Sequence, residues 1–396
     1  MVDLPKIANV VVVGGGVIGL SVARSLALRG LCDVLVIERG SLGAESSFAA
    51  AGMLAPQAEA DRADKFFELC RQSRDLYPAF AASLREQTGI DVELETTGTL
   101  YLAFTEEDVN ELEERYEWQS RAGLAIEKLS AEAARQLEPA ISENVRTALR
   151  FPLDMQVENR RLVRALAVAN ETLGVGIVTE TAVESIKLDR GCVAGVKTSG
   201  GLVTTDTVVM AGGAWTSLIT VSEQTTADKN QSDCNTPDKA FRSVRIEPVR
   251  GQMLSFTTAP QIARHVIYSP RGYIVPRSDN RLLAGSTTEH VGFAKQVTDE
   301  GVRSITAAAV EISPQIASLP LTESWAGLRP RAPDNLPVLG PCAEIAGVFY
   351  ATGHYRNGIL LAPITGELIA QAIVDKVVAP ALNEFSPDRF SVVNVT

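Results

Sequence analysis

The hydrophobic positions of the first forty residues fall into three short blocks separated by glycine and polar residues. Residues 10–13 are four consecutive valines followed by three glycines, and a short apolar run of this kind is typical of a buried parallel strand. Apolar residues recur at helical spacing over residues 17–28, and Gly30 follows as a stop signal. Residues 34–37 form a second apolar run. The three blocks together predict a β-α-β unit.

The rest of the chain alternates between helical and strand-like patterns. Residues 58–89 carry apolar positions at helical spacing, and Pro78 is expected to kink this helix or to start a new one. The middle of the chain is rich in strands, which are expected at 251–256, 272–276 and 281–285. Near the C-terminus, an apolar helix is expected from Gly358 to about residue 377.

The composition is that of an ordinary globular protein with an acidic surface. Acidic side chains number 48 and basic ones 37, which disfavours binding to nucleic acid or to anionic membranes. The five cysteines are scattered, as is typical of proteins in a reducing compartment. None of the three histidines stands four residues from another, so we expect no metal site. No signal peptide and no integral membrane segment is recognisable, so we expect a soluble, cytoplasmic protein.

A glycine fingerprint stands directly between the first expected strand and helix. In the pattern Gly14-x-Gly16-x-x-Gly19, the first glycine permits a tight turn, the second lets the backbone approach a pyrophosphate, and the third lets helix and strand pack closely. Glu38 ends the second strand, where a carboxylate can accept hydrogen bonds from both ribose hydroxyls and would repel a 2′-phosphate. The pattern favours FAD or NAD over NADP. The alternative is a glycine-rich turn that binds nothing.

These patterns predict an α/β chain in which a Rossmann-like nucleotide-binding domain is interleaved with an α+β substrate domain on a mostly antiparallel sheet. The nucleotide-binding domain is expected to comprise residues 1–57, 150–220 and 320–396, and the substrate-binding domain residues 58–149 and 241–319. Residues 221–240 are rich in serine, threonine and other polar residues. They are interpreted as a polar surface insertion without chemistry.

Six motifs, which follow one another along the chain, indicate whether the dinucleotide is FAD or NAD. They are Gly14–Gly19, Glu38-Arg39, Ser46–Met53, Tyr273–Arg277, Trp325–Pro330 and His354–Pro363. In this set and order they resemble the FAD-dependent D-amino-acid oxidase family, in particular its glycine oxidases. The resemblance runs from about residue 9 to residue 377. It implies that the nucleotide-binding domain is an FAD-binding domain.

By this resemblance, the FAD contacts are spread over several segments of the chain. The implied contacts are Gly14, Gly16, Val17, Ile18 and Gly19 at the pyrophosphate, Glu38 and Arg39 at the ribose, Ser46, Ser47, Ala51, Gly52 and Met53 along the flavin, Val183 at the adenine, and His354, Tyr355, Arg356, Asn357, Gly358, Ile359 and Leu360 around the ring system. The amides of a helix starting near Gly358 would also stabilise the negative charge of a reduced flavin. The cysteine that carries covalent flavin in related sarcosine oxidases is absent after Arg329, so FAD is expected to be non-covalent.

The catalytic residues implied by the family are Arg329, Tyr273 and Arg356. The planar fork of an arginine binds a carboxylate through two parallel hydrogen bonds, which suits Arg329 to an amino acid substrate. Tyr273 would donate to the same carboxylate, and Arg356 would be a second arginine at the substrate. The alternatives are a surface arginine in an ion pair and a tyrosine packed in the core. His354 is expected to contact flavin through its backbone and not to act as a general base.

Three further positions are expected to line the substrate pocket, namely Met53, Arg271 and Thr288. Where bacterial glycine oxidases can carry methionine this chain has Thr288, and where they can carry histidine it has Arg271. Both differences would change the size and polarity of the pocket. The sequence therefore leaves glycine, sarcosine, D-alanine and D-proline open as substrates.

The resemblance implies that hydride passes from the substrate Cα to flavin N5. The resulting imine would be hydrolysed to a keto acid and ammonia, and O₂ would reoxidise the flavin to give peroxide. A role in thiamine biosynthesis and a homotetramer are implied by the family alone. A D-amino acid or sarcosine dehydrogenase with another electron acceptor is the first alternative. A cofactor-bound sensor or scaffold is the second, and it would not need a carboxylate clamp beside the flavin.

Overall fold

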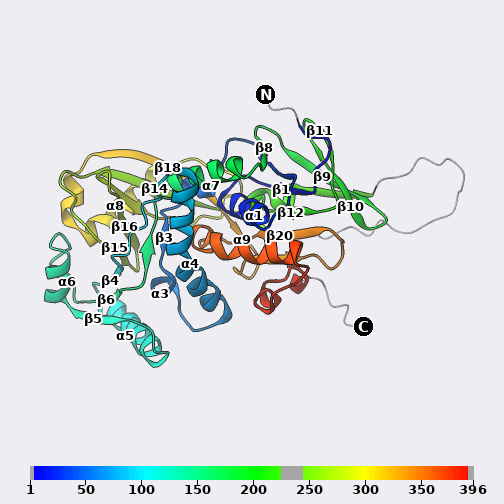
Figure 1. Ribbon diagram of the computed structural model, residues 1–396. Coiled ribbons are helices and arrows are strands. Elements are labelled where there is room, and N and C mark those ends of the chain that lie inside the picture. Colours follow the sequence, from blue (N-terminus) through cyan, green and yellow to red (C-terminus); the bar gives the residue numbers. More distant parts are fainter. Residues whose placement is uncertain (1–3, 224–243, 391–396) are drawn as a thin grey trace, which may run out of the picture.

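The computed structural model describes residues 4–223 and 244–390, and these are organised around two large sheets that lie side by side (Figure 1). The expected 221–240 insertion lies outside the described residues except for positions 221–223, which end a strand.

The first sheet has six strands in the order β19-β20-β12-β1-β2-β8. Every neighbouring pair is parallel except β19–β20. The strands are β1 (Val10–Val13), β2 (Val34–Ile37), β8 (Gly176–Val178), β12 (Val208–Met210), β19 (Val338–Pro341) and β20 (Val348–Thr352). The turn between β1 and the following helix, α1 (Val17–Leu28), carries the glycine fingerprint. The Rossmann-like sheet expected from the sequence is therefore confirmed.

Both faces of this sheet are covered, which explains why its strands are apolar throughout. Alternate residues such as Val10 and Val12 join a core formed with helices, whereas Val11 and Val13 join a core on the other face. The helices of the first face are α1, α4 (Lys65–Thr88), α7 (Asn159–Thr172) and α9 (Gly358–Val374). The second face is covered by a small sheet of β9 (Val183–Asp189), β10 (Cys192–Thr198), β11 (Gly201–Thr204) and β13 (Thr220–Glu223).

The second large sheet has eight strands in the order β18-β14-β17-β16-β15-β4-β6-β5, and only the β4–β15 pair is parallel. Its strands are β4 (Thr99–Ala103), β5 (Glu127–Ser130), β6 (Thr147–Phe151), β14 (Glu247–Thr257), β15 (Val266–Ser269), β16 (Gly272–Pro276), β17 (Arg281–Gly285) and β18 (Leu321–Arg331). The accompanying helices are α5 (Glu106–Arg121), α6 (Ala131–Leu137) and α8 (Asp299–Ile312). The mostly antiparallel substrate sheet is thus also confirmed.

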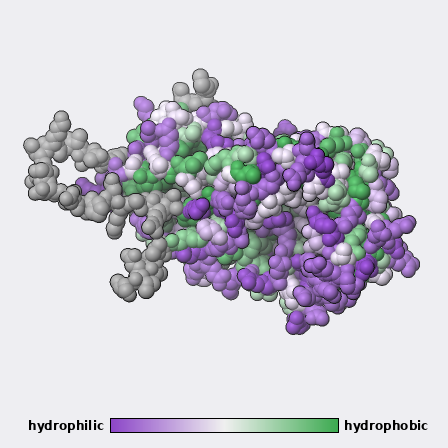
Figure 2. Space-filling model, turned by 180° about the vertical axis from the view of Figure 1, so that it is seen from behind, coloured by the Kyte–Doolittle hydropathy of each residue, from purple (hydrophilic) through white to green (hydrophobic). Residues whose placement is uncertain are grey.

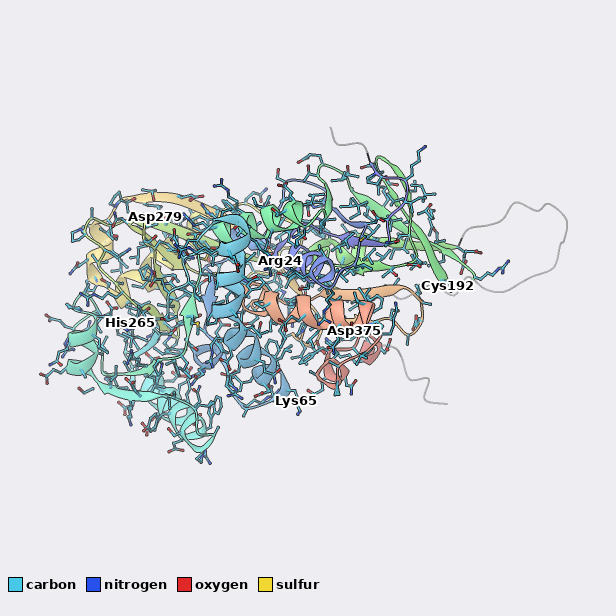
Figure 3. The ribbon with its side chains drawn as sticks, in the orientation of Figure 1. Arg24, Lys65, Cys192, His265, Asp279 and Asp375 are labelled. Atoms are coloured by element: carbon cyan, nitrogen blue, oxygen red, sulfur yellow. The ribbon has the colours of Figure 1, made fainter. Side chains whose placement is uncertain are left out.

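The remaining elements are short. They are α2 (Ser46–Ala49), β3 (Met53–Leu54), α3 (Pro56–Glu59), β7 (Met155–Gln156), and the 3-10 turns η1 (Gly213–Leu218), η2 (Pro314–Ser318), η3 (Pro380–Phe385) and η4 (Pro387–Phe390). In Figure 3, Asp279 and His265 lie on the side of the substrate sheet and Cys192 on the side of the nucleotide sheet.

Helix α4 continues from Lys65 to Thr88 with Pro78 inside it, so the proline does not start a new helix. The helix packs against α7 and α9. Strand β18, which the expected domain division places with the nucleotide-binding domain, pairs with β14 from Arg331↔Glu247 to Leu321↔Phe256.

The exposed surface mixes polar and apolar side chains over the face seen in Figure 2. Within residues 4–223 and 244–390, no helix combines the length and apolar character that crossing a bilayer demands. The same residues contain no group of three or more His, Cys, Asp or Glu side chains placed to hold a metal ion.

Candidate active site

A cavity of about 380 Å³ runs between the two sheets, from the β1–α1 turn to the edge of the substrate sheet. Its walls come from segments that are far apart in the sequence. They are the β1–α1 turn, residues from Ile37 to Glu59, Ala182 and Val183, residues from Ala211 to Ile219, Gly251 and Met253 of β14, Tyr273 of β16, residues from Gly327 to Pro330 of β18, and residues from Ala351 to Ile359.

The fingerprint glycines are required by close backbone contacts. A Cβ on Gly14 would lie 2.5 Å from the carbonyl oxygen of Ala211, and φ at this residue is +108°. A Cβ on Gly19 would lie 1.9 Å from the carbonyl oxygen of Gly14. Gly16 and Ile18 line the cavity at the start of α1, where no acidic side chain occupies the first turn. Free N–H groups and a positive helix end therefore face the cavity, as a pyrophosphate requires.

Glu38 lies where a ribose would be expected. Its carboxylate accepts hydrogen bonds from the backbone N–H groups of Gly15, at 2.7 Å, and Gly40, at 2.9 Å. A carboxylate offers about four acceptor sites, so two remain for hydroxyl groups of a ligand. Next to it, the guanidinium of Arg39 stacks 3.7 Å from the ring centre of Trp215 and pairs with Glu45 at 2.7 Å. This end of the cavity fits the adenosine part of a dinucleotide.

The segment Ser46–Met53 follows the cavity wall in the order expected for a flavin contact. Gly52 has a φ of +70°, and a Cβ here would meet the carbonyl oxygen of Val157 at 2.0 Å. The buried guanidinium of Arg277 donates to the carbonyl oxygen of Ala51 at 2.6 Å and pairs with Glu158 at 3.3 Å. Arg277 therefore holds this segment through its hydrogen bond to Ala51, and the ion pair with Glu158 anchors the guanidinium.

Residues 351–359 close the opposite wall. His354 is buried, and its Nε2 lies 3.0 Å from the hydroxyl of Thr365. Burial lowers the pKa of His354 to about 3, so this imidazole is neutral and a poor base. Helix α9 begins at Gly358 without a capping side chain or an acidic residue in its first turn. Its positive end faces the cavity and would stabilise a negatively charged flavin edge.

Arg329, Tyr273 and Arg356 come together at the inner end of the cavity, although they belong to β18, β16 and the loop before α9. Burial is the main cause that lowers the pKa of Arg329, and the charge of Arg356 acts in the same direction. The hydroxyl of Tyr273 is buried and points to the sulfur of Met253 at 3.3 Å. Two cationic groups and one hydroxyl donor facing a partly buried space are the kinds of group that would hold a carboxylate.

One acidic residue at this end was not found from the sequence. Glu59, the last residue of α3, lines the cavity and accepts a hydrogen bond from the hydroxyl of Tyr268 at 2.9 Å. Its charge is the first cause that raises the pKa of Arg356. Glu59 is followed by alanine and preceded by alanine, and no pattern in the sequence marks it.

A second, wider cavity of about 860 Å³ opens beside the first and shares Glu59, Tyr273 and Arg356 with it. Arg271 and Thr288, which were expected in the substrate pocket, line this outer cavity and not the inner one. Arg271 pairs with Asp108 at 2.7 Å and also with Glu311. The position of the outer cavity makes it the approach to the inner end, with Arg271 committed to ion pairs along its wall.

Most of the expected site residues line the inner cavity. Those that do are Gly14, Gly16, Val17, Ile18, Glu38, Arg39, Ser46, Ser47, Ala51, Gly52, Met53, Val183, Tyr273, Arg329, His354, Tyr355, Arg356, Asn357, Gly358 and Ile359. Gly19 and Leu360 lie behind this wall, Gly19 in the packing of α1 and Leu360 in the core. Residues that the sequence did not mark are Glu45, Glu59, Trp215, Gly251 and Met253.

The fold and the cavity are those of a dinucleotide-dependent oxidoreductase. Residues 9–372 match the family model described as FAD dependent oxidoreductase (DAO). The chain belongs to this family, and its cofactor is FAD. The sequence-based expectations of family and cofactor are confirmed.

Several relatives match over nearly the whole chain. A glycine oxidase of Geobacillus kaustophilus is 36% identical over 384 residues, covering 96% of this chain and 97% of the relative. The crystal structure of a glycine oxidase from Bacillus cereus superposes with a TM-score of 0.84 at 34% identity, covering 93% of this chain and 96% of that one. A bifunctional protein ThiO/ThiG of Trichormus variabilis is 35% identical, and the chain spans 55% of its length.

Proposed function

We propose that this protein is a glycine oxidase-like enzyme that oxidises glycine or another small amino acid at the carbon bearing the amine. The observation that carries the proposal is the meeting of Arg329, Tyr273 and Arg356 at the inner end of the FAD cavity. A sensor or scaffold would not need a carboxylate clamp there. The likeness to relatives named glycine oxidase over 96% of the chain supports the same substrate class.

The residues of the chain act mainly by holding the substrate. Arg329 and Tyr273 bind its carboxylate, and the neutral imidazole of His354 takes no proton from it. Bound FAD supplies the acceptor for the hydride that leaves the substrate Cα. A held geometry alone can lower a barrier by several kcal/mol, up to about 7–11. The product imine is hydrolysed to a keto acid, with release of ammonia where the substrate is glycine or D-alanine, and O₂ is the electron acceptor that is reduced to peroxide.

FAD is held without a covalent bond in this proposal. Among the described residues, the four cysteines are Cys32, Cys70, Cys192 and Cys342. None of these four lines the inner cavity. Denaturation should therefore release all the FAD into the supernatant.

The function is tested by offering the purified yellow protein a panel of glycine, sarcosine, D-alanine and D-proline. Peroxide and the matching keto acid are measured together with oxygen consumption. We expect peroxide from at least one of these substrates in proportion to the keto acid. Reduction of a dye without oxygen consumption would instead identify the alternative, a dehydrogenase. Absence of turnover with both acceptors would contradict the proposal.

We propose further that the enzyme serves thiamine biosynthesis in the cytoplasm as a homotetramer. The likeness to bifunctional proteins ThiO/ThiG supports the pathway. Cells that lose the gene should then require added thiamine, and light scattering on the purified protein should give the mass of four chains. Growth without thiamine would contradict the pathway.

A further inference from the structure

The guanidinium of Arg329 rests on a glycine of the neighbouring strand. A Cβ placed on Gly251 of β14 would lie 2.2 to 2.3 Å from Nη1, Cζ and Nη2 of Arg329. Gly251 is an interior residue of a paired strand and does not have a positive φ. The backbone therefore tolerates alanine here, and the absent side chain is needed for the space that Arg329 occupies.

The same guanidinium is oriented by two acceptors from one short segment. Nη2 donates to the hydroxyl of Ser286 at 2.8 Å, and Nη1 donates to the carbonyl oxygen of Thr287 at 2.9 Å. An arginine has five N–H donors, and in the described part of the chain no acceptor takes the other three. These are the donors left for a substrate.

The segment that carries these acceptors is itself fixed to β14. The hydroxyl of Thr287 accepts from the backbone N–H of Gln252 at 2.9 Å. Backbone hydrogen bonds join Arg250 and Glu289 in both directions, at 2.9 and 3.0 Å, and their side chains form an ion pair. The positions of both acceptors are therefore set by β14, the strand that also contributes Gly251.

No carboxylate within residues 4–223 and 244–390 pairs with Arg329, although neighbouring arginines such as Arg250 and Arg277 have acidic partners. Leaving a partly buried cation without an anion is costly unless a ligand provides one. The neutral hydroxyl and carbonyl orient the guanidinium without neutralising its charge.

We propose that Gly251 and Ser286 are positioning residues, which hold the guanidinium of Arg329 in the orientation that binds the substrate carboxylate. Gly251 leaves the space that the guanidinium of Arg329 occupies, and the hydrogen bond to Ser286 fixes the rotation of that guanidinium. This inference rests on the proposed function, because it assumes a carboxylate at Arg329. It adds two residues to the machinery that determines substrate affinity.

The test compares four variants of the FAD-bound protein: Gly251→Ala, Ser286→Ala, Ser286→Thr and, as a control, Ser278→Ala. Ser278 is exposed in the turn after β16 and hydrogen-bonds only to Glu93 among described side chains. Glycolate, a carboxylate without an amine, is titrated while the flavin absorbance is followed. Glycine kinetics then separate KM from kcat.

We expect Gly251→Ala to raise the Kd for glycolate at least about thirtyfold, because its Cβ displaces the guanidinium. Ser286→Ala should raise it about five- to tenfold, the loss of one hydrogen bond to a charged group. Ser286→Thr should restore most of the affinity, and Ser278→Ala should match the wild type. For Gly251→Ala and Ser286→Ala the change should appear in KM more than in kcat.

The outcomes separate this inference from the function on which it rests. Wild-type affinity for glycolate in both Gly251→Ala and Ser286→Ala overturns the positioning role and leaves the function untouched. A wild-type protein that binds no glycolate and oxidises no amino acid contradicts the proposed function. If Gly251→Ala does not retain FAD, the inference is tested by Ser286→Ala and Ser286→Thr alone. Equal affinity for glycolate in both variants would then overturn the positioning role.

Discussion

At the scale of single residues, the inner end of the cavity is a small set of charges whose balance decides what binds. Arg329 and Arg356 provide two positive charges, and Glu59 provides one negative charge beside Arg356. The site therefore retains one net positive charge for the carboxylate of a substrate. A single substitution at Glu59 changes this balance without altering the fold.

Replacing Glu59 with glutamine should strengthen the binding of simple anions. The substitution keeps an acceptor for the hydroxyl of Tyr268 and removes the negative charge next to Arg356. The Kd for glycolate should fall severalfold at low salt, since partly screened charges a few Å apart interact by about 1–4 kcal/mol. Glu59→Asp, which keeps the charge, is the control. Equal Kd values for the glutamine variant and the wild type would show that Glu59 has no electrostatic role.

The residues of the site differ in how far the sequence marks them. Arg329, Tyr273 and Arg356 stand in recognisable motifs, and all three line the inner cavity. Glu59 and Gly251 do not, because their roles come from neighbours more than seventy residues away in the sequence. Spacing along a chain reveals local structure, whereas such contacts depend on how distant segments pack.

At the scale of elements, the site is built around helix ends and tight turns. Both α1 and α9 begin at the cavity, and the close approach of α1 to β1 depends on Gly14 and Gly19. These features were predictable because each rests on a local pattern. The cap of α7 is Glu158, while the side chain of Asn159, the first residue of the helix, donates to the carbonyl oxygen of Ser47 at 2.8 Å.

Replacing Gly19 with alanine should abolish tight FAD binding. The added Cβ would lie 1.9 Å from the carbonyl oxygen of Gly14 and so push α1 away from the fingerprint turn. We expect the variant to purify without its yellow colour and to need far more FAD in a fluorescence titration. Gly30→Ala, at the other end of α1, is the control. Nothing lies within 4 Å of a Cβ at this position, so FAD affinity should stay intact. Because φ of Gly30 is +82°, the substitution should cost about 1 kcal/mol of stability.

The turn before β7 contains a buried acid that should make stability depend on pH. Burial raises the pKa of Asp154 to about 7, and Arg74 of α4 and the amides of Gln57 and Ala58 only partly oppose this. Glu59 of α3 also raises it. The folded protein thus holds this proton more tightly than the unfolded chain. Stability from this group is greatest below pH 4 and is lost as pH rises to about 7, at about 1.4 kcal/mol per pH unit.

The Asp154→Asn variant removes this dependence. Its Tm should exceed that of the wild type by more at pH 8 than at pH 5, because only the wild type must ionise a buried carboxyl at the higher pH. Thermal unfolding followed by circular dichroism at both values measures the difference. Asp206→Asn at an exposed aspartate is the control. A constant Tm difference between pH 5 and pH 8 would contradict the raised pKa.

At the scale of the whole molecule, two sheets share one cavity, and the chain passes between them several times (Figure 1). The two sheet types were predictable from the patterns. The partner of β18 was not, because its eleven residues pair with β14, about seventy residues earlier, and no local signal encodes that choice. We propose that the domain boundary near residue 320 lies after β18 instead.

The loop from 286 to 298, between β17 and α8, contacts residues that line this cavity. Phe293 packs against Trp215 with ring centres 5.7 Å apart, and Lys295 pairs with Glu45 at 2.9 Å. Trp215 and Glu45 both line the FAD cavity and both contact Arg39. The same loop begins with the residues that orient Arg329. Its outer part therefore packs against two wall residues beside Glu38 and Arg39, while its first residues hydrogen-bond to Arg329.

Removing the contacts of Phe293 and Lys295 should speed the release of FAD. We expect Phe293→Ala and Lys295→Ala each to raise the FAD dissociation rate severalfold, measured as the return of flavin fluorescence after dilution. The effects of the two variants on the FAD dissociation rate should depend differently on salt. At 1 M ionic strength, charges are screened within about 3 Å, so the exposed Lys295–Glu45 pair weakens and the rate of Lys295→Ala should approach that of the wild type. The effect of Phe293→Ala should persist because apolar contact is not screened. Lys295→Arg, which keeps the charge, should release FAD at the wild-type rate. Unchanged release in both alanine variants would show that these contacts do not retain the cofactor.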